Sequence, residues 1–370
     1  MDDRRACEMM RVSKVMRFEF LFQIKSRFYL LGLLIALLFL WSEFSPYIQH
    51  YPVDDNNDIR QLYEKGIHPE LLHIDVSPEE TLSSVLQHID NLPEGILSQE
   101  NYDAAKELSA AIKAQNLSLE QANTLVNQQY PSLAPQWEVY VEEKGQRLGS
   151  IEEVQPAFRA YYEQRTFSSE FAALWVDRLQ IIMSFLSIPA FLMLFFKDRR
   201  FNALEWLHAK AFTGQQYVIG KYLGTVAAWC LPAVLISAAV NIWFGVRFTA
   251  QSFTYHLADL LLGLFVCVVP TFMISGAIII LLGFIFQNEI AALPVFILYL
   301  IFNITSGVFA GNGNTTVMNY MLRLDESISY NWLAFLPHQG LVVGASILFV
   351  LLAGQLWPRQ GLKGKGRLTL

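Results

Sequence analysis

The sequence predicts an all-α membrane protein with six transmembrane helices and a helical extracytoplasmic domain inserted between the first and the second. Three observations predict this class. Of the 370 residues, 53% are hydrophobic and only 16% are charged, whereas a soluble domain has about 25% charged residues. The apolar residues lie in long runs, and lysine and arginine are concentrated in the two tails and one link. The apolar excess therefore indicates spanning helices and not one large core.

Six stretches are apolar enough to cross a hydrocarbon core of roughly 30 Å, which takes about 20 helical residues. They cover about 28–47, 174–196, 222–246, 256–286, 290–311 and 333–356. The third, fourth and fifth contain Pro232, Pro270 and Pro294, and each proline is expected to kink its helix. No A-x-A-like cleavage site follows the first stretch, so we interpret it as a retained anchor and not as a signal peptide.

The distribution of lysine and arginine predicts the orientation, because cytoplasmic links are enriched in both. The N-terminal tail has seven of them, the link between the second and third spans five, and the C-terminal tail four. The short links after the third and fifth spans have one each, Arg247 and Arg323. Both termini are therefore expected in the cytoplasm, and a bacterial plasma membrane is the simplest location.

The predicted divisions follow from the spans and the charges. They are an amphipathic cytoplasmic lead-in at 1–27, the first transmembrane helix at 28–48, an extracytoplasmic helical domain at 49–170, five further transmembrane helices over 171–356 and a basic cytoplasmic tail at 357–370.

Residues 49–170 contain 21 acidic and 8 basic residues, a net charge of −13. Capping-box spacings predict three helix starts, at Ser77/Glu80, Ser118/Gln121 and Ser150/Glu153. Apolar residues follow at helical spacing. The inserted domain is therefore expected to be helical, and a solvated surface explains its acidity better than attraction of cationic peptides does.

The sequence offers no catalytic constellation. It has no H-E-x-x-H, no G-x-S-x-G and no Gly-x-Gly-Asp, and the only approach to a P-loop, between Gly214 and Lys221, has five residues between its glycines and Tyr222 in place of Ser or Thr. The four histidines of the inserted domain are expected at its surface and not in a metal site. We expect neither an enzyme nor a cofactor, and any ATP hydrolysis to occur in another subunit.

Polar residues inside spans are the usual functional candidates. The candidates here are Asp177, Arg178, Asn241, Asp259 and Asn303. A position at the membrane interface explains Asp177, Arg178 and Asp259 without a transport role. Hydrogen bonding between helices explains Asn303.

The link at 197–221 is the most informative stretch. Its apolar residues alternate with charges, which predicts an amphipathic element lying along the inner membrane surface. On this pattern alone, a helix that only anchors the neighbouring spans explains the link equally well.

The link resembles that of the permease subunits of ATP-binding-cassette transporters of the type-2 exporter class. Asn202-Ala203-Leu204-Glu205-Trp206-Leu207 matches the central part of their motif, and Gly220-Lys221 opens the third span as in that family. Phe201-Asn202 replaces the family's Gly-Thr, and Ala211-Phe212 stands where the family has a proline. The topology, with its lead-in helix and its large insertion after the first span, is also similar.

The resemblance implies two protein partners: a cytosolic ATP-binding-cassette ATPase and a second permease subunit, identical or different. It also implies contact with membrane lipid and no binding of nucleic acid. It implies coupling to that ATPase through the link. The expected coupling residues are Arg199, Arg200, Asn202, Leu204, Glu205, Trp206 and Leu207. An amphipathic or hydrophobic cargo such as a peptide antibiotic, a drug or a lipid-linked molecule is expected.

A second segment, 311–332, is too polar to span, and its apolar residues Val317, Tyr320, Met321 and Leu324 predict a short helix at the outer surface.

The competing function is a non-transporting sensor or assembly scaffold whose outer domain binds a ligand. Such a protein has no need of a charged amphipathic link leading into Gly220-Lys221.

Overall fold

The structure is a computed structural model, and it describes residues 2–93, 95–200, 213–305, 319–325, 328 and 330–363. Its contacts divide the chain into two compact units. The helical unit comprises residues 1–45 and 162–370, and the inserted unit comprises residues 46–161. The division lies within α2 (Arg27–His50) and α9 (Ile151–Gln164).

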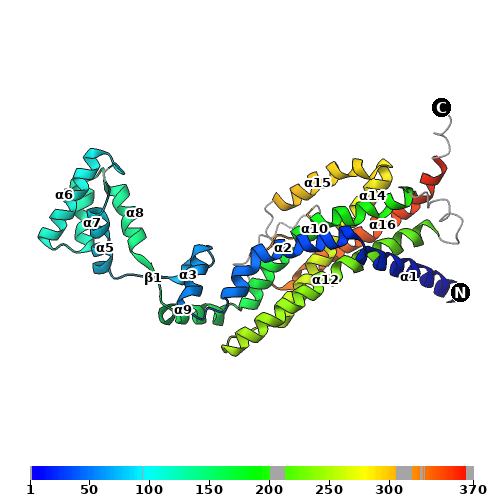
Figure 1. Cartoon of the computed structure of the whole chain (residues 1–370), viewed down its shortest axis with the longest axis horizontal. Coiled ribbons are helices and arrows are strands. Elements are labelled where there is room, and N and C mark those ends of the chain that lie inside the picture. The colour runs from blue at the N-terminus through cyan, green and yellow to red at the C-terminus, as the bar shows by residue number, and fades with distance from the viewer. Residues whose placement is uncertain are drawn as a thin grey trace. The chain divides into compact units, whose positions relative to one another are not determined.

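The described part of the helical unit consists mainly of helices. They are α1 (Asp2–Ile24), most of α2, α10 (Phe167–Arg200), α12 (Gly214–Ala250), α13 (Leu257–Gly263), the π-helical turn η1 (Leu264–Val268), α14 (Val269–Phe286), α15 (Glu289–Thr305), the 3₁₀ turn η2 (Trp332–Phe335) and α16 (Leu336–Lys363). Figure 1 shows α10, α12, α14 and α16 running side by side.

Five of these helices are long and apolar enough to span a membrane. They are α2, α10, α12, the continuous α13–η1–α14 and η2–α16. The remaining apolar helix, α15, has 17 residues, a length of about 26 Å at 1.5 Å per residue. The predicted fifth span continues to 311, and residues 306–318 lie outside the described part, so a sixth span stays a prediction.

The packing distinguishes central helices from peripheral ones. The apolar windows of α10 and α13–η1–α14 are 61% and 72% buried, against 28% to 33% for the other spans. Large side chains on α2 and α15 are exposed, including Leu38 at 61% and Leu298 at 69%. A continuous apolar surface of this kind is unfavourable in water, so lipid is its natural solvent.

The π-helical turn η1 immediately precedes Pro270, one of the three predicted kink positions. Proline has no N–H and crowds the preceding turn, and one π turn is a way for a helix to absorb such a defect. The helix therefore continues through Pro270 from Leu257 to Phe286 over 30 residues.

Helix α1 packs closely against α12 through two glycines spaced four residues apart, Gly220 and Gly224. A Cβ atom at Gly220 would lie 2.8 Å from Val15 side-chain atoms, and one at Gly224 would lie 2.5 Å from the carbonyl oxygen of Met16. Small residues at this spacing let two helix backbones approach each other in apolar surroundings. The predicted lead-in is thus a helix packed on the third span.

The inserted unit is mainly helical, with one antiparallel pair of strands. Its elements are α3 (Asn56–Glu64), α4 (Pro69–Leu72), β1 (His73–Asp75), α5 (Pro78–Asp90), α6 (Gln99–Gln115), α7 (Leu119–Gln129), α8 (Ala134–Lys144), β2 (Gln146–Leu148) and most of α9. Ser77 and Ser118 cap α5 and α7 as predicted, and Ser118 forms the complete capping box. The strands, which pair His73 with Leu148, are not predicted by the sequence pattern.

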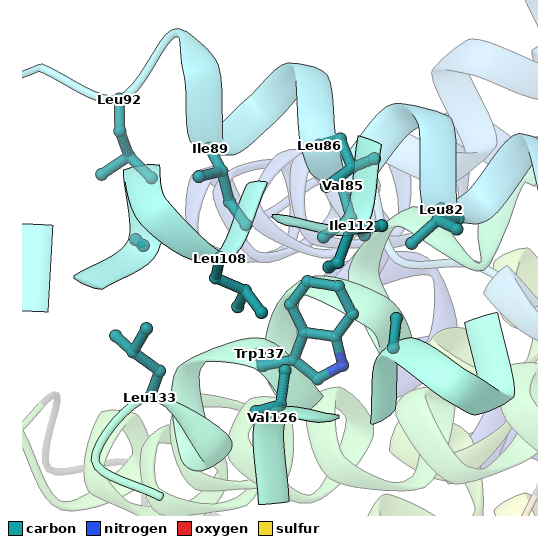
Figure 2. Packing of buried hydrophobic residues seen from close by; sticks show 12 residues of the cluster. Leu82, Val85, Leu86, Ile89, Leu92, Leu108, Ile112, Val126, Leu133 and Trp137 are labelled. Carbon is teal, nitrogen blue, oxygen red and sulfur yellow. The ribbon is translucent and has the colours of Figure 1, made fainter. Parts of the chain in front are cut away.

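The core of the inserted unit lies among α5, α6, α7 and α8. Figure 2 shows Trp137 of α8 near Ile112 and Leu108 of α6 and Val126 of α7. The indole N–H of Trp137 donates a hydrogen bond to Asn123 Oδ1 at 2.6 Å, so the polar atom of this large ring is satisfied.

We predict that Val85→Ala lowers the free energy of unfolding of the inserted unit by about 2 kcal/mol, since Val85 is 0% exposed and its lost methyl groups leave a cavity. Val139→Ala makes the same chemical change on α8 at 57% exposure and should alter stability by less than about 0.5 kcal/mol. Limited proteolysis of the full chain in denaturant measures both. Equal effects of the two changes would contradict this core.

Candidate functional site

Residues 319–325 form a buried non-helical segment in the helical unit. The short helix expected over 311–332 is therefore wrong for this part, and 306–318 lie outside the described residues. Tyr320, Met321 and Leu322 are each at most 2% exposed. A surface helix cannot bury three consecutive side chains, whereas an extended segment enclosed by other elements can.

Side chains of the surrounding helices satisfy the backbone of this segment. Non-helical backbone at membrane depth is tolerated only where protein or water supplies such partners. On one side, Asn303 Oδ1 of α15 accepts from Tyr320 N at 3.0 Å, and Thr271 Oγ1 of α14 lies 3.4 Å from Tyr320 O. On the other, Gln180 Nε2 of α10 donates to Leu322 O at 2.9 Å. Thr271 also donates to Gln180 Oε1 at 3.0 Å, which joins the two sides.

The carboxylate of Asp177 is the strongest of these attachments. It accepts from Arg323 Nε at 2.8 Å, Arg323 Nη2 at 3.2 Å and the backbone N of Leu324 at 3.1 Å. Asp177 is 1% exposed. Arg323 also donates to the carbonyl oxygen of Ile304 at 2.7 Å, near the end of α15. This bidentate pair fixes α10, α15 and the segment to one another.

The structure buries Asp177 among other helices, within α10 after its tenth residue, and its expected position at the membrane interface stays a prediction. Arg178 is partly exposed and bridges two carboxylates: it donates to Asp177 Oδ2 at 2.9 Å and to Glu43 Oε2 of α2 at 3.0 Å. Burial of Asp177 is favourable only because its charge is surrounded by these donors.

Asn241 and Asp259 lie elsewhere, around the connection between α12 and α13. Asn241 donates to Leu257 O at 2.8 Å and accepts from the hydroxyl of Tyr255 at 2.8 Å. Asp259 lies in the first turn of α13 and accepts from Ser168 Oγ at 2.6 Å. These contacts hold the connection between α12 and α13 in place. Among the predicted intramembrane residues, Asn303 lies with Asp177 and Arg178 near the segment at 319–325.

A second polar cluster lies at the opposite end of the helical unit, where α10 ends and α12 begins. Lys221 is 3% exposed, and its Nζ donates to the carbonyl oxygen of Leu194 at 2.9 Å. The same Nζ lies 3.9 Å from Glu19 Oε2 of α1. It is also 5.2 Å and 5.0 Å from the ring centroids of Phe195 and Tyr217. The cation therefore contacts α1, α10 and α12 at once.

Gln23 extends this cluster along α1. It donates to Glu19 Oε1 at 2.9 Å and to Thr225 Oγ1 at 3.4 Å. Glu19 is 0% exposed. A buried carboxylate and a buried ammonium group thus meet where α1 crosses the start of α12, and each has further polar neighbours.

This second polar cluster lies at both ends of the predicted coupling link at 197–221. Leu194 and Phe195 come just before the link, and Lys221 is its last residue. The structure extends α10 to Arg200 and begins α12 at Gly214, with Thr213 and Gln216 forming a capping box. Of the expected coupling residues, Asn202, Leu204, Glu205, Trp206 and Leu207 lie outside the described residues. Arg199 and Arg200 lie in the last turn of α10, and their side chains are outside the described part as well.

Sequence reasoning missed most residues of the two clusters, although signals for them exist. Glu19 and Gln23 are four residues apart, as are Lys221 and Thr225, so each pair occupies one helix face. Gln180 follows Asp177 by three residues on the same face of α10. No periodicity indicates that the backbone of 319–325 needs these groups.

The fold defines a helical membrane protein with several candidate spans, joined by two polar clusters. Among the described residues, no group of three or more His, Cys, Asp or Glu side chains is placed to hold a metal ion. The family model of the ABC-2 family transporter proteins matches residues 39–345. The chain belongs to this family and is a membrane permease subunit of an ABC transporter. Such permeases are the membrane component and not the ATPase, which they require as a partner.

No significant match is found among curated proteins or among solved structures.

We predict that Asp177→Asn releases the segment at 319–325, because it removes the charge that Arg323 and Leu324 N contact. Trypsin cleavage after Arg323 in the detergent-solubilised chain should become at least about tenfold faster, the equivalent of about 1.4 kcal/mol. Glu43→Gln, at a partly exposed pair, should change cleavage by less than about fivefold. Unchanged protection of Arg323 in Asp177→Asn would contradict the role of this carboxylate.

We predict that Lys221→Met destabilises the helical unit by about 3 kcal/mol, because it removes the ammonium group 3.9 Å from the buried Glu19 carboxylate. The double change Glu19→Gln and Lys221→Met should recover part of the loss, since no buried charge remains. Lys25→Met, at an exposed residue directly after α1, is the matched control and should have little effect. Tryptophan fluorescence during denaturant unfolding measures all three, and additive losses in the double variant would exclude coupling of the pair.

Proposed function

We propose that this permease subunit belongs to an exporter that moves an amphipathic or hydrophobic molecule across the plasma membrane with ATP hydrolysed by a separate cytosolic subunit. The lysine and arginine distribution supports cytoplasmic termini, which puts the inserted unit, with its acidic surface, outside the cell. A second permease subunit completes the assembly in this proposal.

The observation that carries the proposal is the cluster around Lys221. It lies between the last described residues of α10 and the first turns of α12, so it ties together both ends of the link at 201–212. It also includes Glu19, which adds α1 to the same joint. A displacement of the link by a cytosolic partner would therefore move three helices together.

Charged residues of the link suit contact with such a partner. Arg199, Arg200 and Glu205 supply both signs of charge within seven residues of sequence. Single exposed ion pairs contribute little affinity, but their arrangement selects a partner and its orientation. Leu204, Trp206 and Leu207 would hold the element against the spans, with Asn202 at its start.

The cluster around Asp177 and Arg323 supports a separate role at the other end of the same helices. It anchors the segment at 319–325 to α10, the helix that leads from there to the link. Because α10 is one continuous helix whose apolar window is 61% buried, motion at one end has a direct route to the other. This arrangement favours a transporter over a static scaffold.

The proposal is tested by tagging the chain in its native membrane, solubilising it gently and identifying stoichiometric partners by mass spectrometry. We expect a P-loop ATPase without spans of its own. The double variant Arg200→Ala and Glu205→Ala should lose most of this partner and of the associated ATPase stimulation, while it inserts normally. Lys25→Ala, an exposed cation outside the link, is the control.

Two outcomes would contradict the proposal. An ATPase retained at full stoichiometry and activity by the double variant would remove these residues from coupling. Recovery without any ATPase, but with an outer ligand or a signalling protein, would favour the alternative function of a membrane sensor or assembly scaffold.

A further inference from the structure

A cavity of about 180 Å³ lies among α14, α15, α16 and the segment at 319–325. Its wall is mostly aliphatic and aromatic, with Ile274, Val342 and Phe349 among its members. Along α16 it extends from His338 to Phe349, a distance of about 16 Å at 1.5 Å per residue. Leu341 lines it and is 61% exposed, so the cavity opens beside this side chain.

Two side chains of this wall, His338 and Tyr320, have buried polar atoms without a hydrogen-bond partner among the described residues. Both ring nitrogens of His338 and the hydroxyl of Tyr320 are in this state. A neutral imidazole presents one donor and one acceptor, and burying such groups without partners is costly. This largely apolar wall therefore presents the imidazole of His338 and the hydroxyl of Tyr320 as groups able to hydrogen-bond a ligand.

The size and charge of the cavity define what fits. Dry cavities of about 150 Å³ accept benzene, so this one holds a ring or a chain of about seven carbons. No carboxylate, lysine or arginine is among the described residues that line it. A charged ligand would lose its hydration without gaining a counter-charge, which leaves a neutral ligand.

We propose that this cavity binds a small neutral amphiphile, a hydrocarbon ring or chain with one hydroxyl or amide group that hydrogen-bonds to His338. This inference rests on the proposed function in taking the ligand to belong to the exported class of molecules. The ligand lies against Tyr320, whose ring is 5.4 Å from that of Tyr299.

Tyr320 gives the bound ligand a route to the rest of the helical unit. Its backbone N–H donates to Asn303 and its carbonyl oxygen faces Thr271, so its position depends on α14 and α15. A ligand beside Tyr320 therefore stabilises the arrangement of the segment that Arg323 links to α10.

The test uses the full chain in lipid nanodiscs, without ATP or partner, and a diazirine-labelled heptanol together with a diazirine-labelled heptane of equal chain length. We expect saturable heptanol labelling of the peptides that contain Tyr320 and Phe349. Ala345→Phe, which fills the cavity, should reduce this labelling at least about fivefold. Leu348→Phe, on the exposed face of α16 at 53% exposure of Leu348, should leave it unchanged.

The role of the imidazole has its own variants. His338→Leu should weaken heptanol labelling about two- to tenfold, the range that one hydrogen bond contributes, and leave heptane labelling unchanged. His338→Gln should restore it. These variants keep the test decisive if Ala345→Phe does not fold.

Labelling that spreads over the lipid-facing residues of α15 and α16 and ignores Ala345→Phe would overturn the site. Equal affinity for heptanol and heptane would overturn the hydrogen bond to His338. The assay needs neither ATP nor a partner, so it separates the two proposals. Labelling of the cavity in a chain that recruits no ATPase would refute the exporter function and support the ligand site. Normal transport without labelling of the cavity would support the exporter function and refute the ligand site.

Discussion

A polypeptide that leaves helical geometry inside an apolar environment has to find a partner for each N–H and C=O that the helix no longer satisfies. Residues 319–325 meet this constraint with side chains of α10, α14 and α15. The buried polar residues of these helices follow from that need. Asp177 adds a charge to the arrangement, and Arg323 brings the matching charge on the segment itself. The centre of the helical unit is therefore organised around one short stretch of irregular backbone.

The two polar clusters use different solutions to the same energetic problem. Around Asp177, a carboxylate is surrounded by N–H donors, and its charge is shared between two arginines. Around Lys221, the ammonium group combines a carbonyl oxygen, a more distant carboxylate and two aromatic rings. The first arrangement has short, directional contacts and fixes geometry closely. The second is less directional, which suits a joint whose helices change their relative positions.

Much of the helical architecture can be predicted from the sequence. Long apolar runs specify α2, α10, α12 and α14, because composition alone limits where a chain can cross lipid. Hydroxyl caps such as Ser77 and Ser118 specify helix starts. The start of α12 is harder to predict: Thr213 and Gln216 form a capping box, and the helix begins at Gly214, six residues before Gly220. The predicted third span instead starts at about residue 222, directly after the Gly220-Lys221 motif.

The error at 319–325 has a clear physical origin. The spacing of Val317, Tyr320, Met321 and Leu324 fits a helix face, but the same residues are apolar enough to be buried in any conformation. Burial by the surrounding helices favours the extended conformation over the helix. The side chains that make this possible, Gln180, Thr271 and Asn303, lie far from the segment in sequence. Residues such as Glu19 were missed for the same reason, since its partner is visible only once α1 is placed on α12.

The contact between α1 and α12 also has a consequence for biosynthesis. Gln23 and Thr225 are separated by 202 residues, and a ribosome adds roughly 5 to 20 residues per second. The lead-in helix is therefore complete for roughly 10 to 40 s before its binding surface exists. The Glu19 carboxylate can enter its buried position only when Gly220 and Gly224 have been made. Helix α1 therefore docks long after its own synthesis.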